Sequence, residues 1–244
     1  MAGTLAAFVT TLYSFYSTVF QPVLALGPYI SLGIFSAGLA AAFSIIYWYF
    51  LDIEKQNELK EKINKYQDKM KQARKDGKAE DASDHMQKTM ELNQKMMLLN
   101  FKPMIGTMVF VALFFPWLGA TYAPAVPLQN GNATYTGEFT FANSSVPVNV
   151  DNTTGTPQIK VGGKEVAVGE TVKVHGIEWQ VTRIGESKSG IFSIHEGKVL
   201  KLNAEFIELP FSIPFAGNEL NWLGFYIVLA MPLTYIFRKM LGVT

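Results

Sequence analysis

The most constraining feature of this 244-residue chain is the confinement of its charged residues to a few stretches. The first 51 residues contain no Lys, Arg, Asp or Glu, and a second stretch without charge runs from residue 103 to residue 137. Charge is absent again between Glu219 and Arg238. A soluble protein needs charged side chains on every helix surface that faces water, so these gaps indicate segments that face lipid.

Three segments within these gaps are long and apolar enough to cross a membrane. Residues 26–51 form the first, since about 20 helical residues rising about 1.5 Å each cover the ~30 Å hydrocarbon layer. Residues 103–122 form the second, which opens on a proline. Residues 219–237 form the third, and Asn218 is expected to cap it. The sequence therefore predicts three transmembrane helices.

Residues 1–25 contain a further apolar helix with an uncharged polar stripe. Pro22 is expected to end this helix. The pattern favours a helix lying in the membrane interface, outside, over a fourth span, and that alternative stays open. The absence of basic residues argues against a secretory signal peptide.

Basic residues and glycosylation motifs together predict the orientation in the membrane. Residues 52–102 carry twelve Lys or Arg, and the tail at 238–244 begins with two more, so the positive-inside rule places both segments in the cytoplasm. The loop between the second and third spans is then outside. Three Asn-X-Ser/Thr acceptors support this assignment because all lie in that loop: Asn132, Asn143 and Asn152. An unmodified polar linker is the alternative.

The charged segment 52–102 predicts an antiparallel coiled-coil hairpin. Its apolar residues alternate at spacings of four and three, and Asp76 with Gly77 breaks the pattern in the middle. Methionine is concentrated in the second half and in the following span, where five methionines share one helical stripe: Met86, Met90, Met97, Met104 and Met108. Ordinary seam packing is one interpretation. The other is a surface for hydrophobic segments of varied shape, which the flexible methionine side chain suits.

The loop between the last two spans divides into two parts. Residues 123–156 are rich in Ser, Thr, Asn and Gly and predict a flexible, glycosylatable tether. Residues 157–210 alternate in short runs and predict a small all-β domain, an antiparallel sandwich or barrel. Its histidines, His175 and His195, are expected on the surface. The candidate strands are Gln158–Val161, Glu165–Val168, Thr171–Val174, Glu178–Ile184, Gly190–His195 and Lys198–Leu202.

The motifs of common enzymes are missing from this sequence. It has no cysteine, which excludes disulfides and thiol chemistry, and it carries no nucleophile elbow, phosphate-binding glycine loop or zinc signature. A net charge of +1 argues against a general DNA binder. We expect no catalytic activity, cofactor or metal.

Short motifs at two junctions resemble a known family. Asn100–Met104, between the hairpin and the second span, and the ending Leu220–Tyr226 with Arg238–Val243 resemble the Oxa/YidC/Alb insertase superfamily, in particular its archaeal YidC-like branch. That branch is related to the insertase subunit of the ER membrane complex. The resemblance covers roughly 1–122 and 205–244, and it leaves the segment 123–204 unexplained.

The resemblance implies a membrane protein insertase that works without ATP. Its spans would enclose a polar groove open to the cytoplasm and to lipid, which lowers the cost of moving a polar tail across the bilayer. The first span has no charge, so an arginine in the groove, as in some bacterial relatives, is absent here. Close helix packing is the alternative role for the polar residues involved. The candidate groove residues are Ser31, Ser36, Ser44, Thr107, Asn221, Tyr226, Thr234 and Tyr235.

The implied partners are the lipid bilayer and hydrophobic segments of nascent membrane proteins. The ribosome or signal recognition machinery at the hairpin, and a second membrane subunit, are further expectations. Two other functions stay open: an ion channel or leak pore, and a cell-envelope receptor or anchor acting through the β-domain. The expected location is an archaeal plasma membrane, with the ER membrane as the alternative.

Overall fold

The computed structural model describes residues 2–130, 134–153, 157–187, 197–213 and 217–242. The chain forms two compact units. The first contains residues 1–38 and 113–230, and the second contains residues 39–112 and 231–244. The long apolar helices begin in one unit and end in the other.

Among the described residues, three helices are long and apolar enough to span a membrane, in agreement with the predicted number. They are α2 (Pro28–Phe50), α4 (Ala79–Tyr122) and α5 (Trp222–Met240). The predicted second span is the C-terminal half of α4, a continuous helix of 44 residues that contains Pro103 in its interior. The third helix starts at Trp222, and the Oδ1 atom of Asn221 accepts a 3.0 Å hydrogen bond from the Gly224 N–H. Asn221 therefore caps α5 in place of the predicted Asn218.

The N-terminal helix α1 (Ala2–Leu24) packs onto the first unit through aromatic rings. The Tyr16 ring centroid lies 5.3 Å from that of Phe114, and Trp117 Nε1 donates a 3.1 Å hydrogen bond to the Ser17 hydroxyl. Pro22 lies inside the last turn of α1, which continues to Leu24, because a proline this close to the end disturbs few helical bonds.

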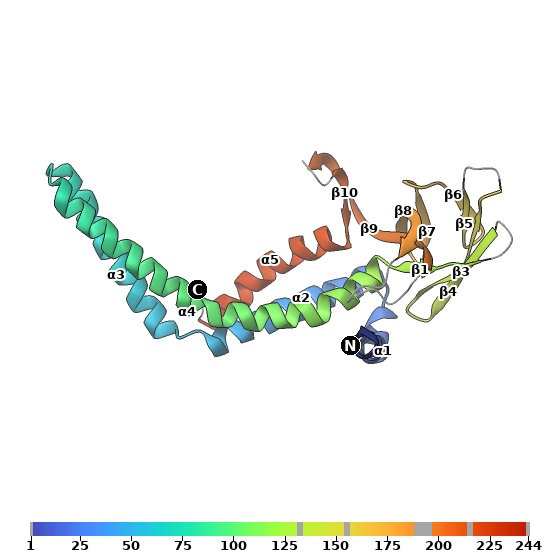
Figure 1. Cartoon of the computed structure of the whole chain (residues 1–244), viewed down its shortest axis with the longest axis horizontal. Helices are drawn as coiled ribbons and strands as arrows, with labels where there is room; N and C mark the ends of the chain where they lie inside the picture. Colours follow the sequence, from blue (N-terminus) through green and yellow to red (C-terminus); the bar gives the residue numbers. More distant parts are fainter. Residues whose placement is uncertain (1, 131–133, 154–156, 188–196, 214–216, 243–244) are drawn as a thin grey trace. The chain divides into compact units, whose positions relative to one another are not determined.

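In the second unit, α3 (Ile53–Lys75) packs against the first half of α4 (Figure 1). Asp52 caps α3 by accepting a 3.0 Å hydrogen bond from the Lys55 N–H. The helix stops at Asp76, and Gly77 takes a left-handed φ of 71°, which glycine adopts without a Cβ clash. The shared core of the pair consists of Leu59, Ile63 and Leu92, with Tyr66, Met96 and Leu99 packed against it.

The segment between α4 and α5 folds into two antiparallel sheets, which confirms a separate β-rich region. One sheet has the order β1-β9-β8-β7, with β10 also paired to β9, and the other has the order β2-β3-β4-β5-β6. The strands are β1 (Ala125–Pro127), β2 (Gln129–Asn130), β3 (Thr134–Phe141), β4 (Ser144–Asp151), β5 (Gln158–Val161), β6 (Lys164–Val166), β7 (Thr171–Val174), β8 (Ile177–Ser187), β9 (Gly197–Ile213) and β10 (Gly217–Asn221). The predicted strand at Gly190–His195 and His195 itself lie outside the described residues.

The prediction of a flexible tether over residues 123–156 is wrong. Four strands, β1 to β4, fall in this segment; β1 pairs with β9 and β4 with β5. The alternation that drives this folding is present in the sequence, since Val148 and Val150 are buried on either side of the exposed Asn149. The exposed positions are rich in Ser, Thr and Asn, and this polar composition led to the prediction of a flexible tether in place of strands.

The two sheets pack against each other through aromatic side chains. The rings of Phe139 on β3 and Trp179 on β8 are fully buried and lie 4.7 Å apart between centroids. Trp179 Nε1 also donates a 3.0 Å hydrogen bond to the carbonyl of Val174, so its only polar atom is satisfied inside the core.

His175 occupies the turn between β7 and β8 and is half-buried, which corrects its expected surface position. Its φ of 55° and that of Gly176, 87°, belong to a tight hairpin turn that directs the imidazole onto the Phe139 ring, 5.4 Å away. Burial lowers the pKa of His175, and a hydrogen bond to the Phe139 backbone opposes this effect. Among the described residues, its Nε2 atom has no hydrogen-bond partner.

We expect the β-rich region to lose stability on mild acidification. The unfolded chain holds His175 near its ordinary pKa of 6.5, whereas the folded pKa is lower, so below that value the unfolded state binds more protons. The contribution of neutral His175 to the free energy of unfolding is complete above about pH 6.5. It is lost as the pH falls through the pKa of His175 in the folded protein. Hydrogen exchange of β7 and β8 in the intact protein, at about pH 7.5 and about pH 5.5, measures it.

A matched control is His175→Asn, because asparagine tolerates the left-handed φ and has no charge to gain. This variant is expected to lose most of the difference in protection between the two pH values. An equal difference in both proteins would contradict the assignment to His175.

Candidate functional site: an exposed methionine stripe on α4

The structure places the five predicted stripe methionines on α4, with their side chains exposed. Large apolar side chains on a helix surface are unusual where that surface faces water, so a continuous row marks an interaction surface. The exposed fractions are 41% for Met86, 56% for Met90, 67% for Met97, 48% for Met104 and 69% for Met108.

The stripe lies to one side of the face of α4 that packs on α3. Successive helical residues are rotated by about 100°, which puts Met86, Met90 and Met97 more than about 90° around the helix from Leu92 and Leu99. The latter two pack in the core shared with α3. Seam packing, the first interpretation of the methionine pattern, therefore accounts for Met96, which contacts this core, and leaves the exposed methionines unexplained.

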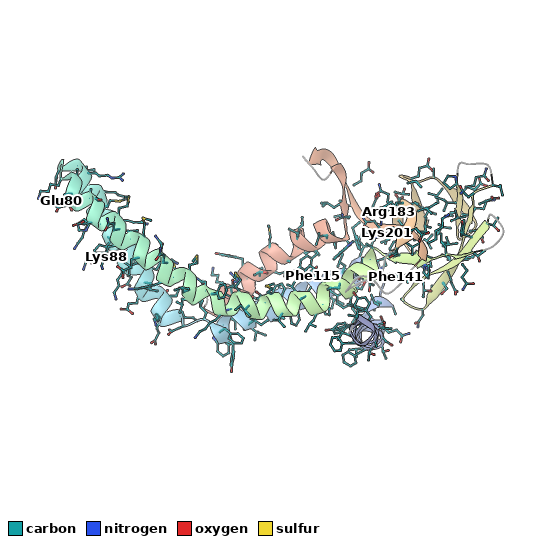
Figure 2. The ribbon with its side chains drawn as sticks, in the orientation of Figure 1. Glu80, Lys88, Phe115, Phe141, Arg183 and Lys201 are labelled. Carbon is teal, nitrogen blue, oxygen red and sulfur yellow. The ribbon has the colours of Figure 1, made fainter. Side chains whose placement is uncertain are left out.

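Charged residues flank the first half of the stripe. Lys88 and Lys95 both bind the Glu91 carboxylate, at 2.9 and 2.8 Å, and Figure 2 shows Lys88 on this part of α4. The hydrogen bonds from Lys95 and Lys88 lower the pKa of Glu91 to about 2. This half of α4 therefore carries the polar surface of a helix in water, with the methionines as an apolar row beside it.

The second half of the stripe runs into the apolar part of α4. Pro103 marks the change, and beyond it the neighbours of the methionines are also apolar and exposed, as Ile105 and Val109 show. Phe101, 49% exposed, connects the two halves at the same helical spacing. Phe101 was not among the predicted residues. It lies four residues after Met97 and three before Met104, which is the spacing of the stripe, so the sequence pattern could have identified it.

The groove residues predicted in the first unit are engaged inside it. The Tyr122 hydroxyl lies 2.6 Å from that of Ser31, which donates in turn to the Pro28 carbonyl, and Ser36 donates to the Leu32 carbonyl at 2.7 Å. Both serines are fully buried. Tyr226 is also buried, with its ring edge-on to Phe115, a residue labelled in Figure 2, while Asn221 serves as a helix cap.

The groove residues predicted in the second unit differ among themselves. Ser44 is fully buried and donates to the Ala40 carbonyl at 2.7 Å, and Thr107 donates to the Met104 carbonyl at 2.9 Å. Thr234 is half-buried, and Tyr235 is 62% exposed. The serines of the first span, which were predicted to line a groove, are buried in this structure, where each hydroxyl donates to a carbonyl of the preceding turn.

One contact in the second unit could not be predicted from the sequence. The Arg238 guanidinium lies over the Tyr47 ring, 4.1 Å from its centroid, in a cation–π arrangement. It fixes the C-terminal end of α5 against the C-terminal end of α2. The two residues are far apart in the chain, so neither local periodicity nor composition could pair them.

Two of the three glycosylation acceptors lie on the β-rich region of the first unit. Asn143 is exposed at the β3–β4 turn, where its Oδ1 accepts a hydrogen bond from Gln21 of α1, and Asn152 is exposed after β4. Asn132 lies outside the described residues. Within the described ranges, no three His, Asp or Glu side chains gather as metal ligands would.

A family model described as "Integral membrane protein EMC3/TMCO1-like" matches residues 17–149, which is more than half of the chain. This match includes α2, α3, α4 and the stripe. Comparison with curated proteins and with solved structures finds no match.

The buried hydroxyl pair offers a direct test of the packed interior. Replacing Ser31 by Ala leaves the Tyr122 hydroxyl without its acceptor, which should lower the free energy of unfolding by about 1–3 kcal/mol. Adding Tyr122→Phe removes the orphaned donor, so the double variant should recover part of that loss. Unfolding of the detergent-solubilised protein by denaturant measures both variants.

The control is Ser36→Ala, whose hydroxyl bonds only its own helix, and its cost should stay small. Equal losses for Ser31→Ala and Ser36→Ala would contradict a structural role for the Ser31–Tyr122 pair.

Proposed function

The chain belongs to the EMC3/TMCO1-like family of integral membrane proteins, and from its exposed methionine stripe we propose that it is a membrane protein insertase. The family is part of the Oxa1/YidC/Alb3 insertase superfamily, so an insertase role agrees with the membership in general terms. The stripe carries the proposal: it binds an apolar segment of a newly made membrane protein and leads it into the bilayer.

The length of the stripe suits one membrane-spanning segment. From Met86 to Met108 there are 22 helical steps, and at about 1.5 Å each they cover about 33 Å. A client helix of about 20 apolar residues has nearly the same length. Unbranched methionine side chains adapt to differently shaped clients, which a surface that serves many sequences requires.

The continuity of the stripe across Pro103 supports a passage from water to lipid. A client that binds at Met86 and Met90 covers one side of its apolar surface while still among charged residues, and its other sides stay in water. Moving toward Met108, it exchanges these contacts for lipid, and transfer of apolar surface releases about 25 cal/mol for each Å² removed from water. This transfer drives insertion without ATP.

For the polar tail of a client, the proposal needs local hydration within the membrane. The buried serines do not supply it, because their hydroxyls are already bonded. Among the predicted groove residues in the second unit, the Thr107 hydroxyl is bonded in the same way, whereas Tyr235 is 62% exposed and Thr234 is half-buried. We assign the passage of the tail to the latter two side chains.

The proposed orientation places the α3–α4 pair in the cytoplasm and the β-rich region outside, by the positive-inside rule. The N-terminus is then outside and the C-terminus cytoplasmic. Two contacts support a parallel course for α2 and α5: Tyr29 and Phe225 meet near the helix starts, with ring centroids 6.3 Å apart, and Tyr47 meets Arg238 near the helix ends. Parallel helices are required if both run from outside to inside.

Further partners follow from the surfaces left exposed. We propose that α5 contacts lipid or a second membrane subunit through its exposed apolar side chains, among them Val228, Met231 and Ile236. The charged surface of α3 and α4 is the proposed contact for the ribosome or the signal recognition machinery. A plasma membrane of an archaeal cell is the proposed location.

Changing Met86, Met90 and Met97 together to Asp should abolish most insertion. Each substitution replaces an apolar contact by a charge that an apolar segment cannot bind, so insertion should fall at least about tenfold. The assay uses the full chain in liposomes with a single-span substrate that has a short external N-terminal tail. Protection of that tail from added protease measures insertion.

The control adds the same charge elsewhere on the helical pair. Asn57→Asp, Asn64→Asp and Gln72→Asp place three carboxylates at exposed positions of α3, and insertion should continue. If insertion by the methionine variant equals that of the wild type, the proposed function is wrong in its central element, and a receptor role of the β-rich region gains support.

A further inference from the structure

The exposed stripe methionines are also accessible sulfur atoms, as are Met231 and Met240 of α5. It contains ten methionines and no cysteine, so an oxidant meets thioethers and no thiols. Met86, Met90 and Met97 lie in the charged half of α4 with 41%, 56% and 67% of their side chains exposed. An oxidant dissolved in water can therefore reach all three without any opening of the fold.

Other methionines on α4 provide an internal contrast. Met96 is half-buried against the core that contains Leu92, where neighbouring side chains cover it. Met104 and Met108 are exposed but lie beyond Pro103, in the apolar half of the helix. The water-facing, oxidisable part of the stripe is thus limited to Met86, Met90 and Met97.

We propose that Met86, Met90 and Met97 form a redox-sensitive section of the stripe, in which oxidation stops client binding and reduction restores it. The inference rests on the proposed function of the stripe. The oxidant is a hydroperoxide such as hydrogen peroxide, and the product of each step is methionine sulfoxide.

The reaction is a two-electron oxygen transfer. The thioether sulfur attacks one peroxide oxygen, the O–O bond breaks, an S–O bond forms, and the second oxygen leaves as water after proton transfer. Sulfur is oxidised by two electrons and the peroxide is reduced by two. A methionine sulfoxide reductase reverses the change: the oxygen leaves as water, and two thiols are oxidised to a disulfide.

Oxidation changes the stripe without disturbing what holds the helices together. A sulfoxide is polar, so an apolar client that contacts it must cover a group that prefers water. The core shared by α3 and α4, formed by Leu59, Ile63 and Leu92, lies on another face of α4. Client binding is therefore lost while the helical pair stays folded.

The test compares three proteins in liposomes: the wild type, the triple variant Met86→Leu, Met90→Leu and Met97→Leu, and the control Met96→Leu. Each is treated with hydrogen peroxide, sulfoxides are located by peptide mass spectrometry, and insertion of the single-span substrate is measured. In the wild type, sulfoxides should form at the three exposed stripe positions and at Met240, which is 76% exposed, and insertion should fall at least about tenfold. Reductase with a dithiol should restore it.

Leucine is apolar but less adaptable than methionine, so the triple Leu variant should insert at a lower level than the wild type. Peroxide should leave that level unchanged, while Met96→Leu should remain sensitive. Circular dichroism checks that helix content is unchanged. Sulfoxides at the three positions with unaltered insertion would overturn the inference and leave the proposed function standing. A peroxide-sensitive triple Leu variant would also overturn it. If the untreated wild type does not insert the substrate, the proposed function itself fails.

Discussion

Hydrogen-bonding groups in the hydrocarbon layer cannot form hydrogen bonds with water. This constraint determines which partners the polar side chains of the apolar helices have. Ser36 and Ser44 satisfy their hydroxyls on the carbonyl one turn back, and Ser31 closes a short chain that runs from Tyr122 to the Pro28 carbonyl. Once these groups are bonded, the interior of the first unit can pack as an apolar core of aromatic rings. Polar residues of a membrane helix are thus no evidence for a groove until their partners are known.

The same constraint gives α4 two different environments along one continuous helix. Before Pro103 its exposed surface is charged, as the Lys88–Glu91–Lys95 cluster shows, and after it the surface is apolar. The methionine stripe continues across this boundary. Each exposed apolar side chain in the charged half lacks the stabilisation of roughly 1.5–3 kcal/mol that its burial would contribute. A helix needed only for support would place polar residues there, so the row is best explained by what it binds.

How far the sequence predicted the structure depends on whether the signal was local. The three apolar helices, the break at Gly77 and strands β5 and β7 follow from charge gaps, turn residues and alternation within a few positions. The strands over 134–151 were missed because their polar composition outweighed an alternation that was present. Non-local contacts gave no signal: nothing near His175 indicates Phe139, and nothing near Ser31 indicates Tyr122. The methionine stripe was predictable as a pattern, but its exposure depended on which face α3 covers.

The choice of methionine over leucine on this surface has a physical consequence. Leucine would bury a similar apolar area, but its branched side chain offers few shapes, whereas methionine rotates about three bonds and its sulfur is polarisable. A surface that must accept many apolar segments gains from that freedom, because no single client fixes its geometry. The freedom is useful only where the side chain is not packed, and an unpacked thioether in water is open to oxidants. Because α3 covers a different face of the helix, Met86, Met90 and Met97 remain exposed. This exposure makes their side chains both adaptable to different clients and sensitive to oxidation.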